Sequence, residues 1–122
     1  MAEQPRELVV LMTHGADSEI SSVAFTVANG AITAGMKVFA FLTSAAVDLV
    51  RKGAIDMAHV PPMDRLKALV QDFLRRGGTI WACPPCAKAR SYTQDDLIPG
   101  VTIQGASAVH ERLKAGAASL SF

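Results

Sequence analysis

Four short runs rich in apolar and β-branched residues recur along this sequence, at residues 8–12, 37–42, 79–82 and 101–104. The first run is continuously apolar, which is typical of a strand covered on both faces in a parallel sheet. Segments with helical spacing or good helix formers follow the runs. Strands that alternate with helices predict an α/β fold, in which one domain holds a mostly parallel, doubly wound sheet with right-handed crossovers and flanking helices.

The segments between the runs predict where the helices lie. The expected helices run from Asp17 or Ser18 to Gly35, over 46–52, over 63–76, from Pro84 to Arg90 and, with Ser107 as its cap, over 108–115. Loops are expected at 54–62 and 93–100, and a short edge strand at 117–122. The first helix is so rich in small apolar residues that we expect burial on more than one side, as at a subunit interface.

Length and charge limit the classes of protein to which the chain can belong. It has 122 residues, half of them hydrophobic and 19% charged, which fits one globular domain over residues 1–122. Twelve basic and eleven acidic residues leave a net charge of +1, so we expect no nucleic-acid partner. Residues 1–7 lack the apolar run of a secretory signal, and no segment reaches the roughly 18 apolar residues of a membrane span. These features predict a cytoplasmic protein.

The two cysteines, Cys83 and Cys86, form a CxxC pair where the third apolar run ends. In a reducing compartment this spacing favours chemistry or metal binding over a structural disulfide framework. Pro84 and the proline after it suit the first turn of a helix, which makes Cys83 a candidate N-cap. Unpaired N–H groups and the helix dipole favour a thiolate there, helped by Lys88 and Arg90 if these side chains fold back.

Four uses of the cysteine pair remain open. A thioredoxin-type dithiol would follow an early strand and use a later cis-proline, whereas this motif follows the third strand. Zinc normally needs four ligands; His14 could join the pair, but a complete set would require a second subunit, and His59 and His110 are expected at surface or packing positions. A persulfide carrier needs one exposed cysteine of low pKa, which fits Cys83 better than Cys86. Both cysteines can also simply pack a strand end.

Sites in parallel α/β sheets form beyond the carboxyl ends of the strands. This rule brings the segments that follow the strands to one edge of the sheet, namely residues 13–17, 43–44, 83–86 and 105–107. Around the cysteines we therefore expect a ligand pocket lined by His14, Asp17, Ser44 and Arg90.

The order of these elements resembles the DsrE/DsrF-like family, of the YchN-like fold, over nearly the whole chain. The matching features are the opening strand with residues 13–18, the helix ends at 34–38 and 73–78, and the cysteine strand tip with residues 87–90. The resemblance implies a subunit with a mostly parallel five-stranded sheet that assembles as a trimer or hexamer. In sulfur-relay members it also implies a strand-tip cysteine that receives sulfur as a persulfide.

That implied role falls on Cys83, whereas Cys86 and the two prolines have no counterpart in the relay subunits. We therefore expect a homo-oligomeric sulfur carrier that uses Cys83, with Cys86 as a secondary thiol. It would need no cofactor or metal and would exchange sulfur with donor and acceptor proteins. Two alternatives stay open: a non-enzymatic oligomeric binding or assembly module, and a CxxC dithiol–disulfide redox protein.

Overall fold

The computed structural model of the protein describes residues 6–122. Residues 1–5, which include most of the segment used above to argue against a secretory signal, lie outside the described residues. In chain order the elements are β1 (Glu7–Met12), α1 (Glu19–Thr33), β2 (Lys37–Leu42), η1 (Ser44–Val50), α2 (Leu66–Arg75), β3 (Thr79–Ala82), α3 (Pro84–Ala89), η2 (Gln94–Asp96), β4 (Val101–Ile103), α4 (Ala106–Lys114) and β5 (Ala118–Ser121). Within residues 6–122 no helix has the length and apolar character needed to cross a membrane.

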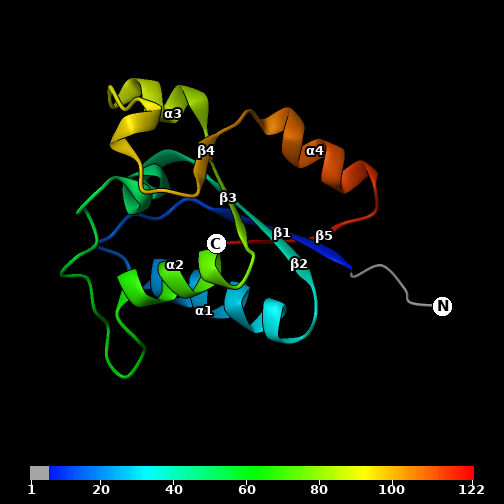
Figure 1. Cartoon of the computed structure of the whole chain (residues 1–122), viewed down its shortest axis with the longest axis horizontal. Coiled ribbons are helices and arrows are strands. Elements are labelled where there is room, and N and C mark those ends of the chain that lie inside the picture. The colour runs from blue at the N-terminus through cyan, green and yellow to red at the C-terminus, as the bar shows by residue number, and fades with distance from the viewer. Residues whose placement is uncertain (1–5) are drawn as a thin grey trace.

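The five strands form one sheet in the order β4-β3-β2-β1-β5, and every neighbouring pair is parallel. This arrangement confirms the predicted α/β fold with a five-stranded sheet, and β5 is the predicted edge strand. The chain runs outwards from β1 to β4, after which α4 carries it back across the sheet to β5 (Figure 1). Parallel neighbours require such crossovers, which place helices on the faces of the sheet.

One face of the sheet carries the main hydrophobic core beneath α1 and α2 (Figure 1). Alternate residues of β1 and β2 point into it, because side chains on a strand change face at every residue. Phe25 of α1 and Phe73 of α2 meet edge to face, with ring centroids 5.7 Å apart. The first helix therefore buries one side against the sheet and another against α2, which accounts for its small apolar residues within a single chain.

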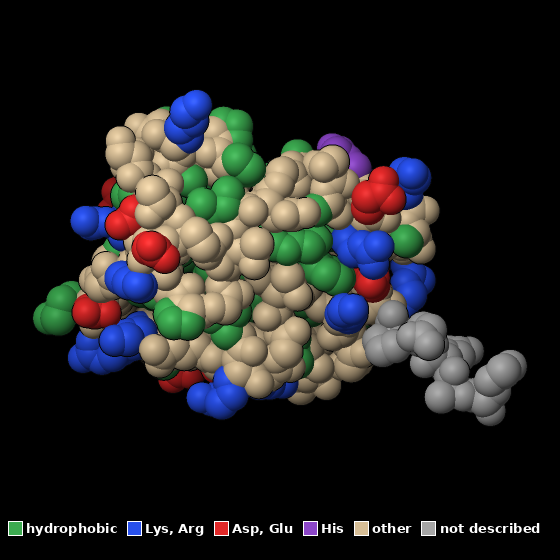
Figure 2. Space-filling view, turned by 45° about the horizontal axis from the view of Figure 1, so that its top comes forward, with side chains coloured by type: hydrophobic (Ala, Val, Ile, Leu, Met, Phe, Trp, Pro, Cys, Tyr) green, Lys and Arg blue, Asp and Glu red, His purple; other side chains and the backbone are tan. Residues whose placement is uncertain are grey.

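The opposite face of the sheet carries Val9, Phe39, Phe41 and Trp81, and α4 covers it without burying any of its own residues fully. The ring centroids of Phe39 and Trp81 lie 5.2 Å apart. A cavity of about 310 Å³ remains between α4 and the strands β1, β2 and β5. In Figure 2, apolar side chains reach the surface between charged side chains at the two sides of the view. The second layer is therefore thinner than the first.

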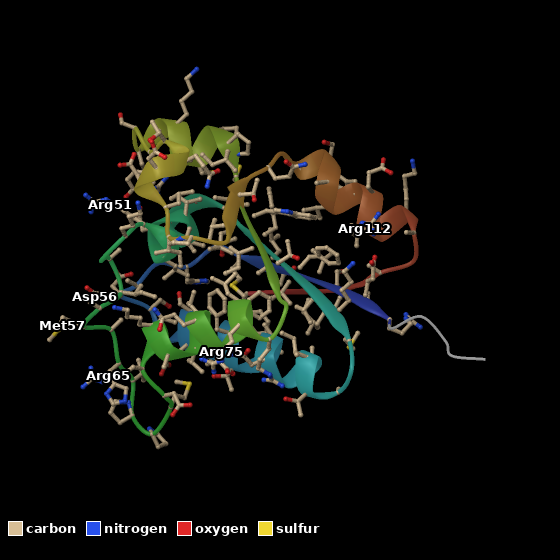
Figure 3. All side chains as sticks on the ribbon, in the orientation of Figure 1. Arg51, Asp56, Met57, Arg65, Arg75 and Arg112 are labelled. Atoms are coloured by element: carbon tan, nitrogen blue, oxygen red, sulfur yellow. The ribbon has the colours of Figure 1, made fainter. Side chains whose placement is uncertain are left out.

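One ion pair fixes α4 over this face. Arg112 of α4 reaches the start of β1 (Figure 3) and donates hydrogen bonds to both carboxylate oxygens of Glu7, at 3.3 and 3.1 Å. The guanidinium of Arg112 also lies 5.8 Å from the ring centroid of Phe39. Ion pairs and cation–π contacts of this exposure each contribute less than about 1 kcal/mol, so they orient α4 rather than hold the fold together.

The starts of three helices and the type of one differ from the prediction. The helix α2 begins at Leu66 rather than at residue 63, because the N–H of Met63 bonds to the carbonyl of Val60 and closes a separate turn. The helix α4 begins at Ala106 with Gly105 as its N-cap, so the predicted cap Ser107 lies inside the first turn. The short helix after β2 is a 3₁₀ helix that begins at Ser44 rather than at residue 46. It ends at Val50, since the next residue is extended and bridges to Leu97.

Candidate functional site

The carboxyl ends of β1, β2 and β3 meet at one edge of the sheet. Backbone hydrogen bonds continue past the strand ends, from the N–H of Thr43 to the carbonyl of Met12 at 2.9 Å and from the N–H of Cys83 to that of Leu42 at 2.9 Å. The segments that follow these strands therefore start side by side, as the predicted sheet requires. The structure thus brings the predicted site segments of β2 and β3 into direct contact.

The chain leaves β2 and β3 towards opposite faces. After β2 it enters η1, whose apolar side chains belong to the core beneath α1 and α2. After β3 it enters α3, which lies on the same side of the sheet as α4 (Figure 1). Ligand sites of parallel sheets commonly form beyond the strand ends, where neighbouring connections leave towards opposite faces. The cysteine pair lies at this divergence.

Cys83 is the N-cap residue of α3, as predicted, with φ −63° and ψ 125°. The two prolines that follow occupy the first helical positions, which suits their fixed φ and missing N–H groups. Cys83 and Cys86 are both free thiols, each half-buried and packed against the edge of the core. The Cys83 and Cys86 side chains lie close to each other at the start of α3. The structure therefore places two reduced thiols side by side.

The pKa of Cys83 shifts in the opposite direction to the one expected for a thiol at the start of a helix. Burial raises the pKa of the Cys83 thiol above its ordinary value, and the neighbouring Cys86 sulfur raises this pKa further. The backbone N–H of Cys86 lowers the same pKa, but it does not reverse the shift. The expectation of a thiol poised as thiolate at Cys83 is therefore wrong in direction, because desolvation outweighs the contribution of the helix end.

Neither basic residue of α3 folds back to neutralise a Cys83 thiolate. Arg90 Nε lies 3.2 Å from Asp48 Oδ1, and Arg90 Nη1 donates to the carbonyl oxygen of Cys86 at 3.2 Å. The other basic residue, Lys88, is exposed. Arg90 therefore lies beside the pair, where it supports the backbone of α3 and anchors it to η1.

Ser44 contacts the cysteine pair through its backbone. Its N–H donates a hydrogen bond to Cys86 Sγ with the nitrogen 3.1 Å from the sulfur. Ser44 has φ 52°, in the left-handed region that costs a residue with a side chain roughly 1 kcal/mol or more. The sequence predicted Ser44 as a pocket residue from its place after β2, but it gave no sign that the amide rather than the hydroxyl would make the contact.

A polar cluster that sequence reasoning missed lies behind the cysteines. The Tyr92 hydroxyl donates to Asp48 Oδ1 at 2.7 Å, and this bond is the main cause that raises the pKa of Tyr92. Asp48 is thus shared by Tyr92 and Arg90, while the guanidinium of Arg51 lies 5.7 Å from the Tyr92 ring centroid. The available signal was that Asp48 is a single charged residue among the apolar residues of η1.

His14 and Asp17 lie on the loop after β1, at the same edge but apart from the cysteines. Both are exposed, and within the described residues no hydrogen bond or ion pair joins either one to Cys83 or Cys86. The loop is held from below by Ser21, whose hydroxyl donates to the carbonyl oxygens of His14 and Gly15 at 2.9 and 2.7 Å. The loop also lies close to η1, since a Cβ on Gly15 would stand 3.3 Å from that of Ala45.

The described residues do not assemble a metal site. Among residues 6–122 no group of three or more His, Cys, Asp or Glu side chains lies within reach of a common ion. Any zinc bound by the two cysteines would therefore need ligands from outside this part of the chain. The site that the structure does form consists of two neighbouring thiols, a backbone donor from η1 and the polar cluster around Asp48.

Comparison with known proteins places this fold in a family. The model of the DsrE/DsrF-like family matches residues 6–122. The uncharacterized protein MJ0760 of Methanocaldococcus jannaschii is 31% identical over 101 residues, which are 82% of this chain but only 37% of that longer protein.

Solved structures show the same fold at low identity. The ychN protein from E. coli superposes with a TM-score of 0.80 at 16% identity, covering 98% of this chain and 100% of that one. The protein of unknown function MTH1491 from Methanobacterium thermoautotrophicum has a TM-score of 0.73 at 17% identity, covering 98% of this chain and 100% of that one. The conserved protein of unknown function BT1422 from Bacteroides thetaiotaomicron has a TM-score of 0.69 at 21% identity, covering 95% of this chain and 94% of that one.

Proposed function

The chain belongs to the DsrE/DsrF-like family, and on this premise we propose that it is a sulfur carrier whose Cys83 accepts a sulfane sulfur as a persulfide. In the proposed step, the Cys83 thiolate attacks the outer sulfur of a donor persulfide. A bond forms between Cys83 Sγ and that sulfur, the donor's sulfur–sulfur bond breaks, and the donor leaves as a thiolate. An acceptor thiolate later removes the sulfur in the same way.

The observation that carries this proposal is the position of Cys83. The residue directly follows the interior strand β3, where the chain turns into α3, and its half-buried sulfur lies close to a second thiol. Partial burial suits a persulfide, because a shielded terminal sulfur is lost less readily to solvent thiols. The raised pKa of Cys83 makes the uptake step depend on pH, since only the thiolate attacks.

The oligomer and the partners belong to the same proposal. The whole chain would act as one domain within a homo-oligomer, a trimer or hexamer, that meets protein donors and acceptors at the strand-end edge. The apolar cavity beneath α4, which the exposed Leu120 borders, supports assembly, since a second copy can cover this surface. His14 and Asp17, exposed on the loop after β1, would contact a partner protein rather than the sulfur.

Mass spectrometry tests the proposal directly. The reduced protein is incubated anaerobically with inorganic polysulfide, desalted and weighed without reductant. We expect Cys86→Ser to gain the mass of one sulfur atom and Cys83→Ser to gain none. If Cys86→Ser takes up no sulfur at any pH up to the titration of Cys83, the carrier proposal is wrong.

A dithiol–disulfide redox function is the second candidate, and the proximity of the two free thiols favours it. It predicts that the wild type cycles between dithiol and disulfide with a protein dithiol, while neither single variant holds sulfur. If the cysteines neither take up sulfur nor oxidise as a pair, the chain is better explained as a binding or assembly module.

A further inference from the structure

The position of Cys86 is not explained by a simple carrier, which needs one cysteine. Its sulfur lies close to the Cys83 sulfur and accepts a hydrogen bond from the Ser44 N–H at 3.1 Å, so it is held in a defined position beside the proposed acceptor. We propose that Cys86 attacks the persulfide formed on Cys83 and releases the carried sulfur as hydrosulfide. This inference rests on the proposed function, because it starts from the Cys83 persulfide.

The step balances as an exchange between two sulfur–sulfur bonds. The Cys86 thiolate donates its electron pair to Cys83 Sγ, a Cys83–Cys86 disulfide forms, and the bond to the terminal sulfur breaks. The terminal sulfur leaves with that electron pair as HS⁻, and the Cys86 thiol proton passes to solvent. The carried sulfur is reduced while the two cysteines are oxidised, so a protein dithiol or a small dithiol must reduce the disulfide before the next cycle.

The backbone of η1 orients Cys86 for this attack. The hydrogen bond from the Ser44 N–H fixes the Cys86 sulfur beside the first turn of α3. The donor is fixed before the reaction, because the N–H of Thr43 is bonded to β1 and the N–H of Ala46 to the carbonyl of Thr43. The left-handed φ of Ser44 turns its amide towards the sulfur. A strained residue with a defined partner is the pattern expected where backbone geometry serves chemistry.

The two prolines keep the attacking sulfur near its target. Pro84 and Pro85 have fixed φ angles, so the turn between the cysteines has few alternative conformations. Attack on the inner sulfur is also favoured by its leaving group, since hydrosulfide leaves more readily than an alkyl thiolate. Relay subunits with one cysteine lack such an attacker. The pair therefore predicts sulfide release in place of storage.

The experiment follows the fate of one loaded sulfur in three variants. Reduced wild type, Cys86→Ser and Cys83→Ser are each loaded anaerobically with polysulfide, desalted quickly, and followed by intact mass and by a sulfide probe. In the wild type we expect the added sulfur to disappear, one equivalent of sulfide to appear, and the protein to end two hydrogens lighter than its reduced form. The Cys86→Ser variant should keep its added sulfur at least tenfold longer.

Each alternative result has a distinct meaning. If wild type and Cys86→Ser retain sulfur equally long, resolution by Cys86 is overturned while the carrier function stands. If the wild type keeps its sulfur on Cys86, transfer to the outer sulfur has occurred and the inference is also overturned. If Cys83→Ser holds the sulfur and Cys86→Ser does not, the roles are reversed and both proposals fail. The variant Cys86→Ala repeats the test without a polar side chain, so a folding defect of one variant does not decide the result.

Discussion

The amide nitrogen of Ser44 lies 3.1 Å from Cys86 Sγ and joins the end of β2 to the first turn of α3. Ser44 makes this contact with φ 52°, and Ser91, where the chain leaves α3, has a similar φ of 59°. Two residues with side chains thus adopt left-handed backbone near the same short helix. The geometry of the cysteine pair therefore depends on a left-handed backbone conformation, which residues with side chains rarely adopt.

Glycine at position 44 should keep the contact and relieve the strain. Ser44→Gly retains the N–H and permits positive φ, so we expect the free energy of unfolding to rise by about 0.5 kcal/mol. Ser91→Gly should behave alike, whereas Ser107→Gly within α4 should lower stability by about 0.5–1 kcal/mol. Urea denaturation of the three variants checks this. Equal destabilisation by Ser44→Gly and Ser107→Gly would contradict the strained geometry.

The reactivity of Cys83 should depend on pH with a raised midpoint. Burial and the Cys86 sulfur both raise the pKa of Cys83, so its alkylation by iodoacetamide should reach half its maximal rate above the ordinary pKa of a thiol. Cys86→Ser removes the neighbouring sulfur and keeps the backbone N–H, so the midpoint should fall while remaining raised by burial. An unchanged midpoint in this variant would show that the two thiols are not coupled.

The same shift has a consequence for stability at alkaline pH. The folded pKa of Cys83 lies above its unfolded value, so the folded state holds the proton more tightly. This contribution is fully present below the unfolded pKa and is lost as pH rises through the folded pKa. Cys83→Ser should therefore flatten the alkaline end of the profile of unfolding free energy against pH, relative to the wild type.

The bond between Tyr92 and Asp48 should be measurable as a coupling energy. Removal of the hydroxyl in Tyr92→Phe and of the carboxylate in Asp48→Asn should each destabilise the fold, with a coupling of about 1 kcal/mol in a double-mutant cycle. The partial exposure of both groups keeps the value low. A cycle that replaces Asp48→Asn with Asp95→Asn, at an exposed neighbouring carboxylate, should give a coupling near zero.

Replacement of glycine by alanine should have opposite effects on stability at two positions. A Cβ on Gly78 would lie 2.5 Å from ring atoms of the fully buried Phe73, so Gly78→Ala should cost about 1–3 kcal/mol. A Cβ on Gly30, within α1, meets nothing within 4 Å, so Gly30→Ala should stabilise by about 0.5–1 kcal/mol. Thermal unfolding of the two variants provides the comparison, and destabilisation by Gly30→Ala would contradict the open space at that position.

The strands and most helix ends follow from local sequence. The run Leu8 to Met12 and the cysteine strand at 79–82 are strands as predicted, and Ser18 caps α1 by accepting the N–H of Ile20. Such features are readable because the residues that interact lie within a few positions of one another. The predicted starts of α2 and α4 lie two or three residues from the observed ones, because turns with competing hydrogen bonds lie beside each helix start.

The sequence by itself determined the parallel α/β sheet, the edge at which the strand ends gather, and the presence of a CxxC pair at the start of a helix. Only the tertiary structure decided how that pair is poised. Cys86 meets a backbone amide 42 residues away, and Asp48 meets a tyrosine 44 residues away. Burial around Cys83 reverses the effect expected from its helix end. Contacts between residues so far apart in the sequence depend on how the segments after β2 and β3 pack against each other. A local sequence pattern does not show this packing.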